Sequence, residues 1–331
     1  MADVFAFGIG MSETDSQGNP LDCYFPSPCL NPTPAVVAAI ASLPTGTSTV
    51  SPQEISHLID DHALAPAAML EADKPLHVVK LAEDNAIGST PEAYLKLHLL
   101  SHRMTLPNTL NLDGVFAHLP NLAWTTRGAI RTEELDQQIL NARLKGEHLE
   151  VMSVDKFPKM VNYVMPSGVR IADASRIRLG AYLGDGTTVM HEGFVNFNAG
   201  ALGPNMVEGR ISQGVTIDAG TDLGGSASTM GTLSGGGEIT ITLGKNCLVG
   251  ANAGTGIPLG DRCTIEAGLY ITAGTVVTII DETGTEVRKA KARELAGNSD
   301  MLFIRNSQNG QVMCRTNRRA IELNDTLHAH N

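Results

Sequence analysis

The second half of the chain carries an aliphatic residue at every sixth position. The first block keeps one register without a gap, through Ile171, Ile177, Leu183, Val189 and Val195. Three later blocks resume the spacing after slips of register, and they comprise Ile211, Ile217 and Leu223, then Leu243 and Val249, then Leu259, Ile265, Ile271 and Val277. A spacing of six fits neither an α-helix nor a single strand, so it indicates a repeat architecture.

This hexapeptide spacing has a simple physical interpretation. Each hexapeptide forms one flat face of a coil with its aliphatic residue pointing inward, and three hexapeptides complete a turn. Small residues such as Ser175 and Cys263 recur four positions after the aliphatic one, near the corners. Because successive coils stack at ~4.8 Å and bury each other's aliphatic residues, no coil is stable alone. The spacing predicts a parallel β-helix over residues 160–285.

Two slips of register interrupt the repeat. The first lies between Val195 and Ile211, and the second, rich in Gly and Ser, lies between Leu223 and Leu243. Extra residues are tolerated in a repeat where they leave the coil, and the resulting loops commonly carry binding sites. Both segments are therefore predicted to be loops. The Ser-Gly-Gly-Gly string at 234–237 matches neither a Walker nor a dinucleotide motif, so it is interpreted as a flexible loop.

Residues 1–150 lack the six-residue spacing and are predicted to form a separate mixed α/β domain. Apolar residues three and four apart predict helices over residues 34–43, 52–62, 91–102 and 132–144. Two of these segments contain histidines four or five residues apart, at His57, His62, His98 and His102. Without an HExxH pattern, these histidines are interpreted as surface or packing residues rather than metal ligands.

Residues 286–331 are predicted to form a basic C-terminal extension, in which Asn309-Gly310 between β-prone segments indicates a hairpin. Between Val287 and Ala320, eight basic residues stand against two acids, Glu294 and Asp300. The basic residues are Arg288, Lys289, Lys291, Arg293, Arg305, Arg315, Arg318 and Arg319. In a chain of net charge −11, this local excess predicts a site for anionic groups such as phosphates.

Composition excludes several classes of function. The net charge of −11 disfavours nonspecific binding to nucleic acid or to an anionic membrane. The opening MADVFAFGIG lacks the features of a signal peptide and no later segment runs apolar long enough to span a bilayer, so a cytoplasmic protein is expected. The five cysteines are odd in number and lack CxxC spacing, so they are expected to be reduced thiols.

An ordered set of strings carries a specific resemblance. It comprises VMHEGFVNFNAG at 189–200, then MVEGRIS, MGTLSGGG, GANAGTGIPLGD, EAGLYITAGT and KAREL. With these strings the chain resembles the tetrahydrodipicolinate N-succinyltransferase family of hexapeptide-repeat acyltransferases, strongly over residues 160–331 and less distinctly before them. The resemblance implies that the β-helix is left-handed, an exception to the right-handed rule for parallel crossovers.

The resemblance also implies a function. Members of this family transfer a succinyl group from succinyl-CoA to the amino group of a small tetrahydrodipicolinate-derived acceptor in diaminopimelate and lysine biosynthesis. They form homotrimers with active sites between neighbouring coils. Glu208 in MVEGR matches the family's catalytic carboxylate, and Arg210 matches a ligand contact.

The same resemblance places acyl-CoA contacts at Gly225, Ser228, Ala251, Glu266, Ala267, Gly274, Lys291, Arg305, Asn306 and Ser307. This choice of residues is chemically sensible. Small side chains along a coil let the pantetheine arm approach the backbone, while Lys291 and Arg305 are suited to phosphates. Some relatives hold a divalent ion such as Mg²⁺ with an acidic pair, of which Glu192 matches one member. Ser175 stands where the second acid is expected, which weakens the case for a metal ligand at Glu192.

Two mechanisms remain open for Glu208. Its carboxylate either attacks the thioester to form an acyl anhydride or takes the proton of the attacking amine. Arg210 is suited to a substrate carboxylate, with a salt bridge to Glu208 as the alternative.

Three other functions are compatible with a hexapeptide repeat. One is another hexapeptide acyltransferase, with an acetyl donor, a sugar or amino-acid acceptor and His191 as the base. A γ-type carbonic anhydrase is excluded because His191 is the only histidine in the repeat, where three zinc ligands are needed. A nonenzymatic trimeric scaffold would explain the repeat but neither the two slips of register nor the basic tail.

Overall fold

The computed structural model describes residues 4–60, 62–234 and 239–316. These residues form two compact units. The first holds the described residues up to Leu99, together with Thr109–Pro158 and Asn162–Val164. The second holds Leu100–Asn108, Lys159–Val161 and the described residues from Met165 onward.

The first unit is built on an antiparallel sheet of order β2-β1-β4-β3. Its strands are β1 (Ala6–Met11), β2 (Cys29–Leu30), β3 (Gly46–Val50) and β4 (Leu76–Leu81). Its helices are α1 (Pro34–Ala39), α2 (Pro52–Asp60), the 3₁₀ turn Ala67–Glu71 and α3 (Thr90–Ser101). Fully buried apolar side chains such as Phe7, Ile55 and Val78 form the core between sheet and helices.

A second sheet in this unit has the order β6-β5-β7. It consists of β5 (Leu122–Thr125), β6 (Gly128–Arg131) and β7 (Val151–Asp155), accompanied by α4 (Val115–His118) and α5 (Leu135–Leu144). The four predicted helices are therefore present; three are shorter than predicted, and α3 has the predicted length but begins one residue earlier. The sequence analysis did not predict α4, because four residues are too few to show a helical period.

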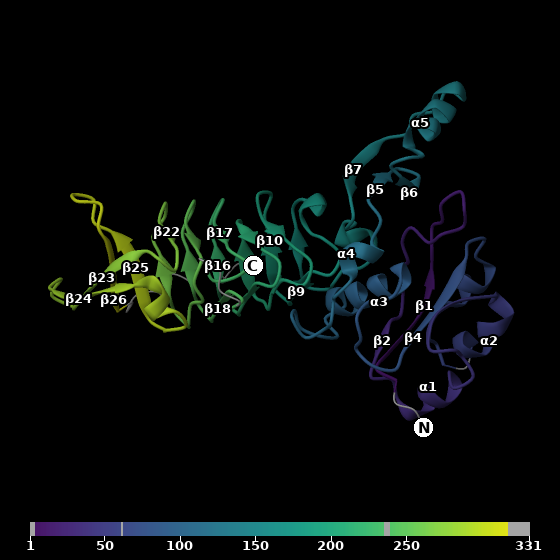
Figure 1. The fold of residues 1–331 in the computed structure, drawn as a ribbon, viewed down its shortest axis with the longest axis horizontal. Coiled ribbons are helices and arrows are strands. Elements are labelled where there is room, and N and C mark those ends of the chain that lie inside the picture. Colours follow the sequence, from purple (N-terminus) through teal and green to yellow (C-terminus); the bar gives the residue numbers. More distant parts are fainter. Residues whose placement is uncertain (1–3, 61, 235–238, 317–331) are drawn as a thin grey trace. The chain divides into compact units, whose positions relative to one another are not determined.

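The second unit is a left-handed parallel β-helix with three faces, and Figure 1 shows its strands stacked as successive rungs. One face contains β8 (Arg170–Ile171), β10 (Thr187–Val189), β13 (Asn205–Val207), β16 (Asp222–Leu223), β19 (Leu248–Val249) and β21 (Thr264–Ile265). The next contains β11 (Phe194–Val195), β14 (Arg210–Ile211), β17 (Ser228–Thr229), β20 (Gly254–Thr255) and β22 (Tyr270–Ile271). The third contains β9 (Tyr182–Leu183), β12 (Gly200–Ala201), β15 (Thr216–Ile217) and β18 (Thr242–Leu243).

The aliphatic residues of the repeat point inward and stack in register. On the first face Val189, Val207, Leu223, Val249 and Ile265 pair in that order, and each is at most 1% exposed. Burying a side chain of this size contributes about 1.5–3 kcal/mol. Each coil therefore depends on its neighbours for most of its stability.

The prediction of a loop between Val195 and Ile211 is wrong. Ala201 and Val207 continue the six-residue register after Val195, and both are fully buried within the coil. The slip arises because the corner between β13 and β14 is short and contains only Glu208 and Gly209, whereas residues 190–193 lie between β10 and β11. Alanine provides too little aliphatic signal to reveal the register, so a shortened corner resembled an inserted loop.

The second predicted loop is present but starts later than expected. Thr229 occupies an inward position against Thr255, and the described residues between β17 and β18 then leave the coil. Ser234 returns to the coil, where its Oγ accepts a hydrogen bond of 2.6 Å from the Ala273 backbone N–H. The remainder of the predicted string 234–237 lies outside the described residues.

The C-terminal strands extend the first face of the β-helix. They are β23 (Val276–Ile280), β24 (Glu286–Lys291), β25 (Met301–Arg305) and β26 (Val312–Thr316), with a 3₁₀ turn at Ala292–Leu295. β25 and β26 pair as an antiparallel hairpin, as Asn309-Gly310 predicted. Shorter 3₁₀ turns lie at Met160–Asn162 and Ala174–Arg176. None of the helices described here has the length and apolar character needed to cross a membrane.

Candidate active site

The outward side chains on the second face form a polar ladder. The strand register places Phe194, Arg210, Ser228, Gly254 and Tyr270 beside one another on successive coils. Arg210 Nη2 donates to Ser228 Oγ over 2.6 Å, and Ser228 Oγ lies 3.3 Å from the Tyr270 hydroxyl. Gly254 is required here because a Cβ at this position would clash with the Tyr270 ring.

The corner between the first and second faces carries several of the predicted site residues on successive coils. From one coil to the next they are Glu208, Gly225, Ala251, Ala267 and Arg305. Backbone hydrogen bonds join neighbouring levels: Ser226 N–H to Glu208 O (3.2 Å), Asn252 N–H to Gly225 O (2.8 Å) and Gly268 N–H to Ala251 O (2.8 Å). Small residues therefore line a continuous edge of the β-helix that begins beside Glu208.

An open cavity of about 450 Å³ lies where this corner meets the ladder. It is lined by Arg176, Glu192, Phe194, Gly209, Arg210, Ser226, Ala227 and Ser228. Glu208 is not among the lining residues, but it directly precedes Gly209, so we place it at the edge of the cavity. A Cβ built on Gly225 would be 3.7 Å from Glu192 Oε2 and 3.8 Å from Glu208 Oε2, so both carboxylates face the same glycine. The site thus combines two carboxylates, two guanidinium groups and two hydroxyl groups.

Glu208 and Glu192 differ in their partners. Glu192 Oε2 accepts a hydrogen bond of 2.9 Å from Ser226 Oγ. Among the described residues, no side chain or backbone group hydrogen-bonds to the half-buried carboxylate of Glu208, and Arg210 makes no ion pair with it within 4.0 Å. The salt bridge considered as an alternative role for Arg210 is therefore absent from this part of the structure. The Glu208 carboxylate is available to a substrate.

Other predicted contacts form a second group. Ala292 N–H donates to Thr275 O over 2.8 Å, and this bond brings Gly274 and Lys291 close together at a different corner. Glu266 Oε2 accepts from Arg305 N–H over 2.7 Å, so this carboxylate holds the end of β25. Asn306 and Ser307 lie in the connection between β25 and β26.

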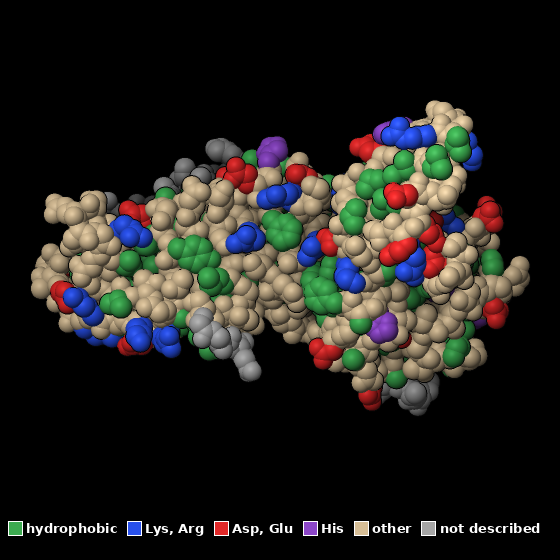
Figure 2. All heavy atoms as spheres, turned by 45° about the horizontal axis from the view of Figure 1, so that its top comes forward, with side chains coloured by type: hydrophobic (Ala, Val, Ile, Leu, Met, Phe, Trp, Pro, Cys, Tyr) green, Lys and Arg blue, Asp and Glu red, His purple; other side chains and the backbone are tan. Residues whose placement is uncertain are grey.

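The basic tail is partly neutralised within the chain. Arg288 lies 3.6 Å from Glu294, and Lys289 lies 4.0 Å from Glu286. Arg318 and Arg319 lie outside the described residues. Figure 2 nevertheless shows Lys and Arg side chains gathered at the end of the β-helix that carries β24 and β26.

The residues of one chain do not fit a metal site at Glu192. Among the described residues, no three His, Cys, Asp or Glu side chains come close enough to hold an ion. Ser175 Oγ is engaged with Asp173 over 2.6 Å. Mg²⁺ requires about six oxygen ligands, so one carboxylate bonded to Ser226 is insufficient. The prediction of Mg²⁺ rests on the resemblance alone, and no step below uses a metal.

Four residues of the site were not predicted from the sequence: Arg176, Phe194, Ser226 and Tyr270. Arg176, Phe194 and Tyr270 each stand one position before an inward aliphatic residue. Listing the outward residue of every third hexapeptide would have found these three on one face. Ser226 sits on a corner, where the repeat gives no such signal.

Comparison with known proteins identifies the family. The chain is 55% identical over 340 residues, covering 99% of each chain, to the 2,3,4,5-tetrahydropyridine-2,6-dicarboxylate N-succinyltransferase of Pseudomonas putida. The chain belongs to this N-succinyltransferase family. The enzyme of the same name from Vibrio cholerae is 49% identical, again over 99% of both chains. Family models match residues 119–159 as "Tetrahydrodipicolinate N-succinyltransferase middle" and residues 240–273 as "Hexapeptide repeat of succinyl-transferase".

Structural comparison agrees with the family. A solved structure from Campylobacter jejuni, assigned as a 2,3,4,5-tetrahydropyridine-2-carboxylate N-succinyltransferase, matches with a TM-score of 0.86 and 30% identity. The match covers 97% of this chain and 94% of the other. As a member of the N-succinyltransferase family, the protein is an acyltransferase. His191, the base expected for another hexapeptide acyltransferase, is exposed and does not line the cavity.

Proposed function

We propose that this N-succinyltransferase moves the succinyl group of succinyl-CoA to the amino group of a tetrahydrodipicolinate-derived acceptor, in the cytoplasm and as a homotrimer. The observation that carries the proposal is the unpaired carboxylate of Glu208 at the edge of a cavity that also presents Arg210. The names of the relatives, which describe succinyl transfer to a tetrahydropyridine dicarboxylate, support the choice of donor and acceptor.

The reaction needs a neutral amine beside the thioester carbonyl of succinyl-CoA. As the amine attacks, Glu208 takes its proton and the carbon–sulfur bond breaks. Glu208 then passes that proton to the departing CoA thiolate, which leaves as a thiol. In the alternative, the Glu208 carboxylate displaces the CoA thiolate to form an anhydride, which the amine then opens while regenerating the carboxylate.

Arg210 and Arg176 suit the charges of the substrates. A guanidinium group matches the geometry of a carboxylate, and both acceptor and succinyl group carry carboxylates. Ser228 holds Arg210 through the 2.6 Å hydrogen bond, which fixes the guanidinium before substrate arrives. Such preorganisation favours correct placement of the reacting atoms.

The CoA portion has a suitable surface along the corner of the β-helix. Gly225, Ala251 and Ala267 keep that edge low, so a pantetheine arm can reach the backbone. Arg305 stands at the end of the same edge, where it can meet phosphate oxygens. Lys291, near Gly274, belongs to a separate surface and would contact CoA only around the next corner.

The decisive measurement is CoA thiol release with succinyl-CoA and enzymatically generated tetrahydrodipicolinate. We expect acceptor-dependent release by the wild type, and a loss of at least about a hundredfold in Glu208→Gln, in line with the usual contribution of a general base or nucleophile. Glu286→Gln, which changes an exposed carboxylate on β24, is the matched control and should remain active.

The same assay tests the choice of donor, and a separate measurement tests the mechanism. Acetyl-CoA should be a poor donor, and equal rates with both donors would reject the succinyl assignment. Intact-protein mass spectrometry after mixing with succinyl-CoA alone distinguishes the two roles of Glu208. A succinyl adduct lost in Glu208→Gln indicates the anhydride, and its absence with full turnover indicates the base.

A further inference from the structure

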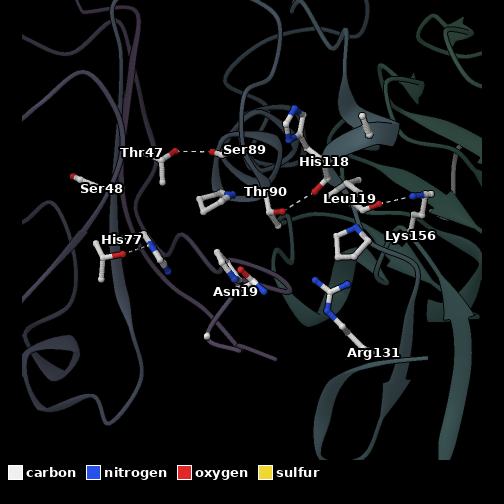
Figure 3. A pocket seen from close by; sticks show the side chains of 16 residues that line it. Asn19, Thr47, Ser48, His77, Ser89, Thr90, His118, Leu119, Arg131 and Lys156 are labelled. Carbon is white, nitrogen blue, oxygen red and sulfur yellow. Dashed lines mark hydrogen bonds between the residues drawn. The ribbon is translucent and has the colours of Figure 1, made fainter. Parts of the chain in front are cut away.

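A second cavity lies entirely within the first unit and shares no residue with the acyl-transfer cavity. Its volume is about 680 Å³, within the ~300–1,000 Å³ typical of small-molecule sites. Its walls come from residues 18–20, β3, β4, the start of α3, residues 117–120, β6 and Lys156 directly after β7, as Figure 3 shows. The acyl-transfer reaction proposed above gives this cavity no role.

His77 is the unusual residue of this cavity. The side chain lies on β4 and is only 5% exposed. Its Nδ1 lies 3.4 Å from Thr49 Oγ1, while Nε2 is buried and has no hydrogen-bond partner among the described residues. In Figure 3 the second ring nitrogen points away from Thr49, toward the space beside Asn19. Folded proteins retain few buried polar atoms without a partner, so such an atom in a cavity wall points to a ligand.

The ring of His77 is suited to donate a hydrogen bond. Burial lowers the pKa of His77, so the imidazole is neutral near pH 7. If the Thr49 hydroxyl donates to Nδ1, the proton of the neutral ring resides on Nε2. A ligand that accepts a hydrogen bond would therefore satisfy the buried nitrogen.

The charges of the wall also favour an acceptor. Arg131 and Lys156 line the cavity, and no Asp or Glu stands among the described residues that do so. Arg131 Nε binds Asp15 over 2.6 Å, which directs the guanidinium, and no bond engages its terminal nitrogens within the described residues. Lys156 Nζ donates to the carbonyl oxygens of Phe116 and Leu119, at 3.0 and 2.5 Å. A third N–H of this ammonium group remains for a ligand.

We propose that this cavity is a binding site for a small metabolite that carries a carboxylate or phosphate group, held by Arg131 and Lys156 and by a hydrogen bond from His77 Nε2. Guanidinium and ammonium groups bind either kind of anion, and the neutral donor adds direction without adding charge. Ser89 and Glu92 already satisfy amides at the start of α3, so that helix end is not needed for binding.

The chain carries its own reporter for a test. Trp124 is its only tryptophan, on β5, and its Nε1 donates to the carbonyl oxygen of Asp155, the residue before Lys156, over 2.9 Å. β5 also pairs with β6, opposite Arg131. We expect the fluorescence of Trp124 to change saturably when sodium phosphate or sodium citrate is added at constant ionic strength. The anion that binds tighter identifies the favoured group, phosphate or carboxylate.

Four variants and one salt control separate the outcomes. Lys156→Gln and His77→Gln should each weaken binding at least tenfold, whereas Lys145→Gln, an exposed residue after α5, should not change it. Because His77 is buried, circular dichroism checks that His77→Gln remains folded, and Lys156→Gln carries the test independently. Arg210→Gln should bind as the wild type does.

Three results would overturn the proposal. These are an equal response to sodium chloride, a response that is unchanged in Lys156→Gln, and a response that vanishes in Arg210→Gln, which would place the anion in the acyl-transfer cavity.

Discussion

At the scale of single residues, Asp22 is a buried acid of the first unit whose carboxyl group is hydrogen-bonded on both oxygens. Its Oδ2 accepts a hydrogen bond of 2.6 Å from the Tyr163 hydroxyl, and its Oδ1 accepts one of 2.8 Å from the Glu13 backbone N–H. Burial raises the pKa of Asp22 despite both bonds, because desolvation disfavours the charged form. In an unfolded chain the Asp pKa is ordinary, near ~3.9. Between that value and the raised pKa of the native state, Asp22 keeps its proton in the native chain and releases it in the unfolded chain.

We predict that Asp22 lowers the free energy of unfolding as the pH rises through its raised pKa. Over that window the native state binds more protons than the unfolded state, so stability falls with pH. Asp22→Asn keeps an acceptor for the Glu13 N–H and cannot ionise, so it should gain stability relative to the wild type between about pH 4.5 and about pH 7.5. Each unit by which the pKa of Asp22 is raised corresponds to about 1.4 kcal/mol in the free energy of unfolding.

Urea unfolding at both pH values measures this difference, with Asp136→Asn on the exposed face of α5 as the control. A wild-type and Asp22→Asn difference that is the same at both values would contradict the prediction.

At the scale of elements, the short corner between β13 and β14 sets the positions of Glu208 and Arg210. Gly209 lies at its centre, and a Cβ there would clash with the carbonyl oxygen of Ala227 on the next coil. That same oxygen accepts a hydrogen bond of 2.7 Å from the Arg210 backbone N–H. Any side chain at Gly209 must therefore push the corner outward and loosen this bond.

Gly209→Ala should lower kcat at least tenfold, about 1.4 kcal/mol in the barrier, because it displaces both functional side chains. Steady-state CoA release measures this loss, and thermal unfolding reports whether the coil survives. Gly274→Ala, whose new Cβ would meet nothing within 4 Å, is the stability control. A Gly209→Ala enzyme with wild-type kcat would show that the corner does not position these residues.

The same corner marks the limit of prediction from sequence at this scale. The six-residue register predicted the coils because the inward aliphatic residues are large and regularly spaced. Ala201, Thr229 and Thr255 also point inward, but a small or polar side chain is not recognisable as part of an aliphatic repeat. The strand register is set by how the coils stack on one another. Inward residues that are not aliphatic can therefore be recognised only from the strand pairing in the structure.

At the scale of the whole molecule, the two sites differed in how far sequence could reveal them. Glu208 and Arg210 lie within one short string, and the resemblance located them. The cavity around His77 gathers residues from seven separate segments of the first unit, and no local pattern joins them. No motif contains Arg131 or Lys156, and only the fold brings them to one cavity.

The acyl-transfer site of one chain is open to water, which bears on assembly. Glu192, Arg210 and Ser226 are exposed, and Tyr270 at the end of the ladder is 37% exposed. A thioester bound on such a surface would remain wet on one side, whereas acyl transfer benefits from a dry environment that strengthens charge interactions. A neighbouring copy of the chain laid against this face would supply the missing wall.

We therefore expect the active species to contain three copies of the 35.0 kDa chain. Light scattering after gel filtration measures its mass, and succinyl-CoA turnover measured over a dilution series tests whether assembly is needed. Specific activity should fall as the trimer dissociates, because each separated chain exposes Glu208 and Arg210 to solvent. Placing a charge on the exposed ladder by Tyr270→Glu should weaken assembly, while the same change at Val276, exposed on β23 beside the C-terminal hairpin, should leave it intact. A monomer with undiminished turnover would show that one chain completes the site.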